Sequence, residues 1–169
     1  MPAVIREKTT ADGPACVDLL LRVHRTDGYP MHLAPDEVPG FFTAGVEAAA
    51  WVAELDGDIV GHVALHTPPD DPTLDVAAGA TGLPVDRLAL VARLFVDPGQ
   101  RRTGLGRLLL RHAAAAAPQL GRRAVLDVGQ TLPTAVALYD SEGWQRVGDL
   151  HVPLDADTML DLWVYVSPQ

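Results

Sequence analysis

The sequence has 169 residues, which is the size of one ordinary domain. It is 48% hydrophobic and 21% charged, a composition that can fill a packed core and differs from that of a disordered chain. The 13 basic residues against 22 acidic ones give a net charge of −9, so nonspecific binding to nucleic acid, which depends on basic side chains, is not expected.

The first part of the chain predicts a short strand followed by two helices. Residues 3–8 are β-prone, and Thr9 and Thr10 can cap a following helix. Apolar residues then recur at spacings i, i+3, i+4 and i+7, which places them on one helix face: Cys16, Leu19, Leu20 and Val23. Residues 26–30 contain Gly and Pro and end this helix, and a second, shorter helix is expected from about residue 35.

A β-hairpin and a long connection follow. Residues 50–55 and 59–66 are β-prone runs that flank Asp56-Gly57-Asp58, a strong signal for a tight turn. Residues 67–83 are rich in Pro, Asp and Gly, and we expect them to form a mobile loop that is longer than most unstructured connections.

The second half of the chain alternates strands and helices. Residues 88–96 are mostly apolar and predict a strand buried on both faces, and a helix is expected over about residues 104–117. A strand (124–128), a helix (134–142) and two strands (144–152 and 159–166) complete the chain. The order β-α-α-β-β-β-α-β-α-β-β predicts a single α/β (α+β) domain over residues 1–169, built around one sheet.

Basic residues are concentrated in one part of this acidic chain. The stretch 98–126 contains no Asp or Glu, yet it holds six of the 13 basic residues: Arg101, Arg102, Arg107, Arg111, Arg122 and Arg123. Such an island favours a local anion, for example a phosphate-bearing ligand, rather than a polyanion. A solvated helix face is the alternative explanation.

The turn before the helix at 104–117 has the features of an anion site. Gly104 and Gly106 lack side chains where backbone N–H groups would approach a ligand closely. The free N–H groups of a first helical turn, together with the helix dipole, bind anions such as a pyrophosphate. No Gly-Lys-Ser/Thr follows, which excludes a P-loop, and Leu109 stands where the dinucleotide-binding fingerprint has its third glycine.

The string Arg101-x-x-Gly104-x-Gly106, preceded by Val96-Asp97-Pro98, resembles the acyl-CoA-binding motif of the GNAT superfamily of N-acyltransferases. Leu138-Tyr139 followed by Gly143-Trp144 is similar to a later helix and strand of that family, and the order of elements matches over essentially the whole chain. The resemblance implies a mixed, mostly antiparallel central sheet flanked by helices. In the family fold, the strands corresponding to 88–96 and 124–128 splay apart around the acyl-CoA.

The resemblance also implies an activity and a set of site residues. It implies transfer of an acetyl (acyl) group from acetyl-CoA to a primary amine, by direct attack in a ternary complex and with no metal. The backbone of Leu94, Phe95 and Val96 would pair with the pantetheine arm like an added strand. The pyrophosphate would lie on the turn residues Arg101, Arg102, Thr103, Gly104, Leu105, Gly106 and Arg107. Tyr139 matches the family tyrosine that helps the thiolate leave as a general acid, the alternative being a packed ring with its hydroxyl at the surface.

The sequence departs from the family at two places. Leu132 stands where many relatives carry Asn, and no acidic residue lies within 88–96, so the general base is not identified. Base candidates are Glu54, His62, His66 and His151, of which His62 and His66 share a strand face and could line a cleft. Two alternatives therefore stay open: a catalytically inactive acyl-CoA-binding sensor or partner module, and a nucleotide-binding α/β protein that uses the glycine turn for another phosphate ligand.

The remaining expectations concern the surroundings of the protein. Cys16 is the only cysteine, which excludes an internal disulfide and a multi-cysteine zinc site. No run approaches 18 apolar residues and residues 1–8 carry charges, so we expect a cytoplasmic protein without a membrane span. The resemblance suggests a homodimer, and the negative charge favours a cationic small-molecule or peptide acceptor.

Overall fold

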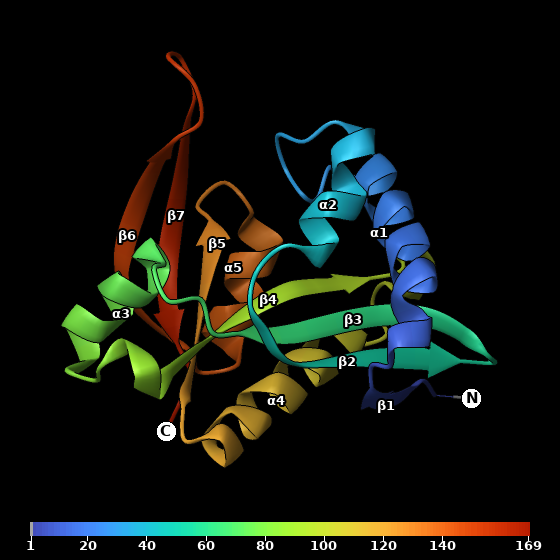
Figure 1. Ribbon diagram of the computed structural model, residues 1–169, viewed down its shortest axis with the longest axis horizontal. Helices are drawn as coiled ribbons and strands as arrows, with labels where there is room; N and C mark the ends of the chain where they lie inside the picture. Colours follow the sequence, from blue (N-terminus) through green and yellow to red (C-terminus); the bar gives the residue numbers. More distant parts are fainter. Residues whose placement is uncertain (1) are drawn as a thin grey trace. The chain divides into compact units, whose positions relative to one another are not determined.

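The computed structural model describes residues 2–169, which divide into two compact units (Figure 1). The first holds the described residues up to His66 together with Ala92–Ala113, and the second holds Thr67–Val91 with Ala114–Gln169. Over these residues seven strands pair in the order β1-β2-β3-β4-β5-β7-β6, and β4 contributes to both units. The β4–β5 pair is parallel, whereas the pairs β1–β2, β2–β3, β5–β7 and β6–β7 are antiparallel. The predicted mixed, mostly antiparallel sheet flanked by helices is confirmed.

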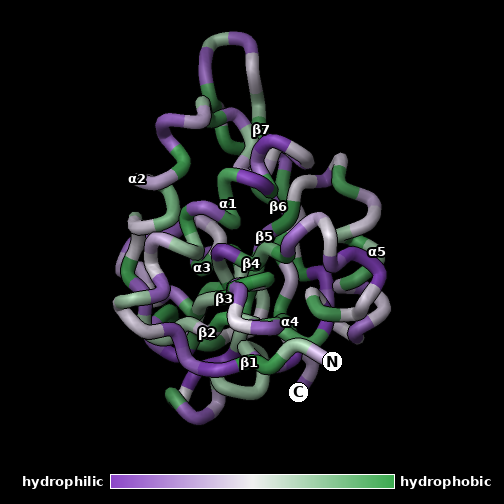
Figure 2. The backbone as a smooth tube through the Cα atoms, turned by 90° about the vertical axis from the view of Figure 1, so that its right-hand side faces the viewer, coloured by the Kyte–Doolittle hydropathy of each residue, from purple (hydrophilic) through white to green (hydrophobic). Residues whose placement is uncertain are grey.

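The first unit surrounds a β-hairpin with helices. Its elements are β1 (Val4–Glu7), α1 (Gly13–Asp27), α2 (Val38–Thr43), β2 (Glu47–Leu55), β3 (Asp58–His66), the second half of β4 (Leu88–Val96) and most of α4 (Leu105–Ala116). Figure 1 shows α1 and α2 on one face of these strands and α4 on the other. Since both faces are covered, β3 is buried from Ile59 to His66, and apart from its two histidines most of its tube has the hydrophobic colours in Figure 2.

The predicted apolar face of α1 is confirmed. Cys16, Leu19, Leu20 and Val23 are buried, and they share one core with Phe42 of α2 and with Val52, Ile59 and Phe95 of the strands. Burial raises the pKa of the Cys16 thiol to about 11, so this side chain is a core residue without the thiolate needed for covalent chemistry. The helix ends at Gly28, whose φ of 75° is the left-handed conformation that glycine adopts freely.

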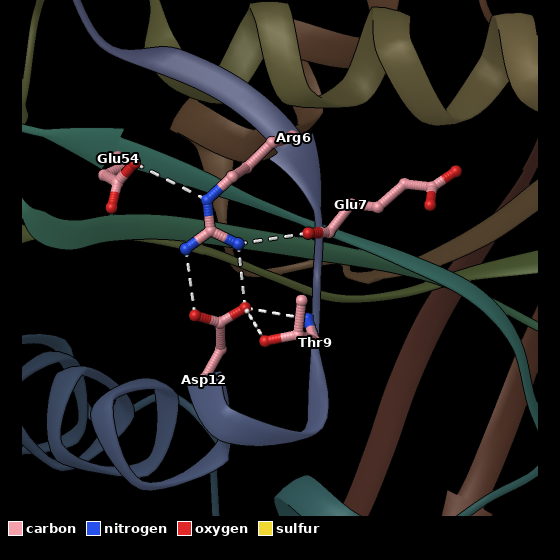
Figure 3. Close-up of polar contacts among 5 residues, drawn as sticks. All are labelled: Arg6, Glu7, Thr9, Asp12 and Glu54. Carbon is pink, nitrogen blue, oxygen red and sulfur yellow. Dashed lines mark hydrogen bonds and ion pairs between the residues drawn. The ribbon is translucent and has the colours of Figure 1, made fainter.

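An ion-pair cluster joins β1 to the start of α1 (Figure 3). The Arg6 guanidinium donates two hydrogen bonds of 2.9 Å to the two Asp12 carboxylate oxygens, and its Nε lies 3.5 Å from Glu54. Asp12 also accepts from the Thr9 N–H at 2.7 Å. The Arg6 guanidinium, followed by the Thr9 N–H, holds the pKa of the Asp12 carboxyl well below its usual range.

The hairpin between β2 and β3 closes through the two residues that the sequence indicated. Leu55 pairs with Asp58, and the two residues between them, Asp56 and Gly57, have φ values of 51° and 86°. Positive φ at both central positions is typical of the turn that matches the twist of antiparallel strands. Gly61 lies further along β3, where a Cβ would lie 2.8 Å from a Leu109 methyl group, so α4 packs directly on this strand.

The second unit is a layer of strands covered by helices. Its elements are the first half of β4, α3 (Pro72–Thr81), β5 (Arg123–Gly129), α5 (Pro133–Ser141), β6 (Gln145–Pro153) and β7 (Met159–Val166). Residues of α3, β4, β5 and β7 form its core: Leu74, Ala77, Leu88, Val125, Val164 and Val166. Short 3₁₀ turns connect elements of both units at Thr10–Asp12, Pro35–Glu37, Val85–Arg87, Pro98–Gln100 and Ala117–Leu120.

The expectation of a loop over residues 67–83 is wrong, because this segment contains α3. Its Asp and Pro residues begin the helix: the Asp71 carboxylate accepts from the N–H groups of Thr73 and Leu74 at 2.9 and 3.2 Å, and Pro72 is the first helical residue. Gly82 ends the helix with a φ of 76°. The order of elements therefore gains one helix between the third and fourth strands.

Candidate active site

The second half of β4 departs from regular strand geometry at Arg93. This residue has a φ of 55°, although it is not glycine and lies within the strand. After it, Phe95 is buried in the core of the first unit, while Leu94 and Val96 are half-buried. The backbone thus changes direction just before the three residues that the family resemblance assigns to the pantetheine arm.

The turn after β4 is held by Asp97. Its N–H donates to the Val60 carbonyl, its carbonyl accepts from Gln100 N–H and its side chain accepts from Gly99 N–H, each at 2.8 Å. Its second carboxylate oxygen accepts from Arg22 of α1 at 3.1 Å. Arg101 also pairs with Asp27 near the end of α1. The turn is therefore fixed to β3 and to α1 before α4 begins.

The N-terminus of α4 leaves backbone donors open. The first hydrogen bond of the helix runs from Leu108 N–H to the Gly104 carbonyl at 3.1 Å, so the N–H groups of Leu105 and Gly106 precede it and have no helical acceptor. The first turn of this helix carries no acidic residue. With the dipole of α4 directed the same way, these N–H groups can bind an anion.

The two glycines differ in what they do for this turn. Gly104 has a φ of 80°, which favours glycine, and an added Cβ there would meet nothing within 4 Å. At Gly106 a Cβ would meet only Val96 Cγ2, at an ordinary 3.8 Å. Packing inside the protein therefore does not require glycine at residue 106, and the bare backbone leaves room for a ligand to approach from outside.

The arginines of the basic island have different partners. Arg122 donates to the Leu88 carbonyl at 2.8 Å, and Arg123 donates to the Ser167 carbonyl at 2.7 Å. These two side chains stabilise the second unit. Arg101 and Arg102 lie on the turn of the first unit and are exposed, Arg101 sharing its charge with Asp27.

Tyr139 lies on α5 in the second unit. It is half-buried, and its ring centroid lies 5.9 Å from that of Tyr165 and 6.3 Å from that of Trp144. Leu132 occupies the position before α5 where a polar side chain could cap the helix, and it is 37% exposed. The ring is thus fixed by two aromatic neighbours, and the acid role of its hydroxyl stays a prediction.

Contacts of the base candidates differ from the expectation. Glu54 is paired with Arg6, and His151 lies exposed between Asp161 at 2.6 Å and Asp149 at 3.1 Å, which together raise its pKa. His62 and His66 do share a face of β3, but both are buried, so they line no open cleft. Strand periodicity indicated their common face, whereas the burial of His62 depends on α2, whose Phe42 packs on its ring.

The part of the chain that is described, residues 2–169, contains no helix long and apolar enough to cross a membrane. Among the same residues there is no group of three His, Cys, Asp or Glu side chains that could hold a metal ion.

Comparisons with known proteins agree with this geometry. Residues 18–144 match the model of the acetyltransferase (GNAT) family. Comparison with curated protein sequences finds no match.

Solved structures share the fold at low sequence identity. An N-acetyltransferase from Staphylococcus aureus is 18% identical with a TM-score of 0.71, covering 98% of each chain. A GNAT-family acetyltransferase from Streptococcus pneumoniae is 22% identical with a TM-score of 0.66, again covering 98% of each. NAA60 of Arabidopsis thaliana, solved in complex with acetyl-CoA, is 18% identical with a TM-score of 0.69 and 97% of each chain covered.

Proposed function

Since the chain belongs to the acetyltransferase (GNAT) family, and is therefore an acyltransferase with acetyl-CoA as co-substrate, we propose that it transfers the acetyl group to a primary amine by direct attack in a ternary complex. The observation that carries the proposal is the N-terminus of α4, where N–H groups precede the first helical bond and no acidic side chain covers them. A primary amine is the acceptor class that the family resemblance implies.

Residues of the first unit suit two parts of acetyl-CoA, the pyrophosphate and the pantetheine arm. The N–H groups at the turn, with the side chains of Arg101, Arg102 and Arg107 nearby in the sequence, would hold the pyrophosphate, and Gly104 and Gly106 present no side chain to obstruct it. The backbone of Leu94, Phe95 and Val96 would pair with the pantetheine arm as an added strand does.

When bound, acetyl-CoA supplies an activated acyl carbonyl and a thiolate leaving group. An N–H group of the strand segment Leu94–Val96 would stabilise the charge that develops on the carbonyl oxygen. Tyr139 would donate its phenolic proton as the thiolate departs. The acceptor must be a neutral amine to attack, and its proton leaves to a base or an ordered water. Holding both substrates together supplies a large part of the rate.

A two-step experiment tests the proposal. Thermal shifts with acetyl-CoA, ATP and NAD identify the ligand, because only a ligand that binds the native state raises the melting temperature. Release of free thiol from acetyl-CoA is then measured with a panel of primary amines. We expect stabilisation by acetyl-CoA and amine-dependent thiol release. Binding without release by any amine would favour the inactive binding module, and stabilisation by ATP or NAD alone would contradict the proposal.

Tyr139→Phe tests the acid separately. Phenylalanine keeps the ring contacts with Trp144 and Tyr165 but cannot donate a proton. We expect kcat to fall about 100-fold, with the Kd of acetyl-CoA unchanged. An unchanged kcat would remove Tyr139 from the mechanism.

A further inference from the structure

The left-handed conformation of Arg93 is maintained by contacts from two other elements. A non-glycine residue with a positive φ inside a strand is strained and persists only where its surroundings hold it. The Arg93 side chain donates to the carbonyls of Phe41 at 3.1 Å and Ala44 at 3.3 Å at the end of α2, and its guanidinium carbon lies 3.9 Å from the centre of the Phe41 ring. These contacts fix the side chain, and the backbone of Arg93 has a separate partner.

That partner is His62 on β3. Its Nδ1 lies 2.8 Å from the Arg93 carbonyl oxygen. The imidazole is fully buried, stacks on Phe95 with ring centroids 5.1 Å apart and an interplanar angle of 16°, and packs at 4.9 Å against the Phe42 ring in an edge-on geometry. The ring therefore has no room to rotate away from the carbonyl.

The chemistry of the imidazole settles which nitrogen carries the proton. Burial lowers the pKa of His62 to about 4, the hydrogen bond to Arg93 acting in the opposite direction, so the ring is neutral near pH 7 with a single N–H. A carbonyl oxygen can only accept, so that N–H is on Nδ1 and donates to Arg93. Nε2 is buried and has no hydrogen-bond partner within the described residues, hence the Nδ1 contact is the one polar constraint on the ring.

The constraint passes directly to Leu94. The carbonyl of Arg93 and the N–H of Leu94 belong to the same planar peptide and point in opposite directions. Fixing the carbonyl of Arg93 therefore fixes the direction of the Leu94 N–H, which is the first backbone donor of the segment proposed to contact the acyl group.

We propose that His62 is a positioning residue for acyl transfer: by donating from Nδ1 to the Arg93 carbonyl, it sets the peptide that aims the Leu94 N–H at the acyl oxygen. The inference rests on the proposed function, since it concerns the same reaction. It assigns to β3 a role in the acyl-transfer step, without contact between His62 and either substrate.

Two variants whose new side chains match each other in shape separate this positioning role from packing. His62→Asn keeps a donor nitrogen at the position of Nδ1, and His62→Leu has the same branching without the donor. Both lose the stacking on Phe95 and the edge-on contact with Phe42. Asparagine also buries an amide oxygen without a partner, so His62→Asn should melt no higher than His62→Leu.

We expect activity to rank in the opposite order from stability. With the amine that supports thiol release in the wild-type protein, kcat should fall about 100-fold in His62→Leu and no more than about tenfold in His62→Asn, with the KM for acetyl-CoA little changed in both. Equal kcat values in the two variants, or a higher kcat in His62→Leu, would overturn the inference while leaving the proposed function intact.

A measurement that needs no turnover tests the role of His62 even if no amine supports thiol release. The amide resonance of Leu94 should differ between the acetyl-CoA and CoA complexes of the wild-type protein and of His62→Asn, because only acetyl-CoA presents the thioester carbonyl. It should not differ in His62→Leu. The same difference in all three proteins would overturn the role of His62, whereas absence of thiol release by the wild type would count against the proposed function alone.

Discussion

Two helices of this protein begin in opposite ways. At α3 the Asp71 carboxylate accepts from the N–H groups of Thr73 and Leu74, and Asp75 adds a second acidic residue in the first turn. At α4 glycine stands before the helix, no acidic residue lies in its first turn, and helical bonding starts only at Leu108. Both helices have the same unsatisfied donors and the same dipole. The first helix supplies an anion to its own N–H groups, whereas the second leaves its first N–H groups without an acidic side chain.

The largest effect is expected when α4 is given an anion of its own. Gly104→Asp places a carboxylate beside the open N–H groups, where it both occupies the donors and repels a pyrophosphate. We expect the affinity for acetyl-CoA, measured by calorimetry, to fall at least about 100-fold, which corresponds to about 3 kcal/mol.

Gly82→Asp is the matched control for this change. Gly82 has a similar φ of 76°, and a Cβ there also meets nothing within 4 Å, so the strain and the added charge are comparable. Its acetyl-CoA affinity should equal that of the wild type. If Gly104→Asp bound acetyl-CoA as well as Gly82→Asp does, the N-terminus of α4 would not be the anion site.

A smaller effect is expected from a single methyl group at Gly106. In Gly106→Ala the new Cβ meets only Val96 Cγ2 inside the protein, and alanine favours a helix over glycine by about 1 kcal/mol. The free energy of unfolding, measured with denaturant, should therefore stay the same or rise. The affinity for acetyl-CoA should fall about tenfold, since the backbone can no longer approach the ligand closely. A loss of stability with unchanged affinity would show that the glycine serves packing instead.

The smallest effect, and one on stability alone, is expected at the closed helix. Asp71→Ala leaves the Thr73 and Leu74 donors without their acceptor and should lower the free energy of unfolding by about 1 kcal/mol. Asp71→Asn keeps an acceptor oxygen and should restore most of it. Acetyl-CoA affinity should be unchanged in both variants, and a drop in either would break the distinction between the two helices.

The contrast between α3 and α4 also explains what the sequence could and could not predict. The glycine turn before α4 was identified because Gly104 and Gly106 follow an apolar strand whose bounds, Leu88–Val96, agree with the prediction. By contrast, α3 was missed because its residues are the usual loop formers: Asp71, Pro72 and Gly82 act here as capping residues, and its only buried apolar residues are Leu74 and Ala77.

Arg93 and His62 show a second reason why the sequence alone does not predict the site. Nothing in the local sequence of β4 marks Arg93 for a positive φ, because that conformation is held by carbonyls of α2 and by an imidazole from β3. Likewise, alternation along β3 predicts which face His62 lies on, but its burial depends on packing against Phe42 of α2 and Phe95 of β4. Such features depend on contacts between residues 20 or more positions apart in the chain and therefore appear only with the fold.

The attachment of the turn to α1 has a consequence for behaviour in salt. Two ion pairs make this attachment, Arg22 with Asp97 and Asp27 with Arg101, and their side chains are open to solvent. Mobile ions screen such pairs, with a Debye length that shortens to about 8 Å at physiological ionic strength. If the proposed function is right and this turn binds the diphosphate of acetyl-CoA, added electrolyte weakens the binding twice, by shielding the diphosphate and by weakening the attachment of the turn. The apparent number of counterions released on binding should therefore exceed the number of charged groups that contact the ligand.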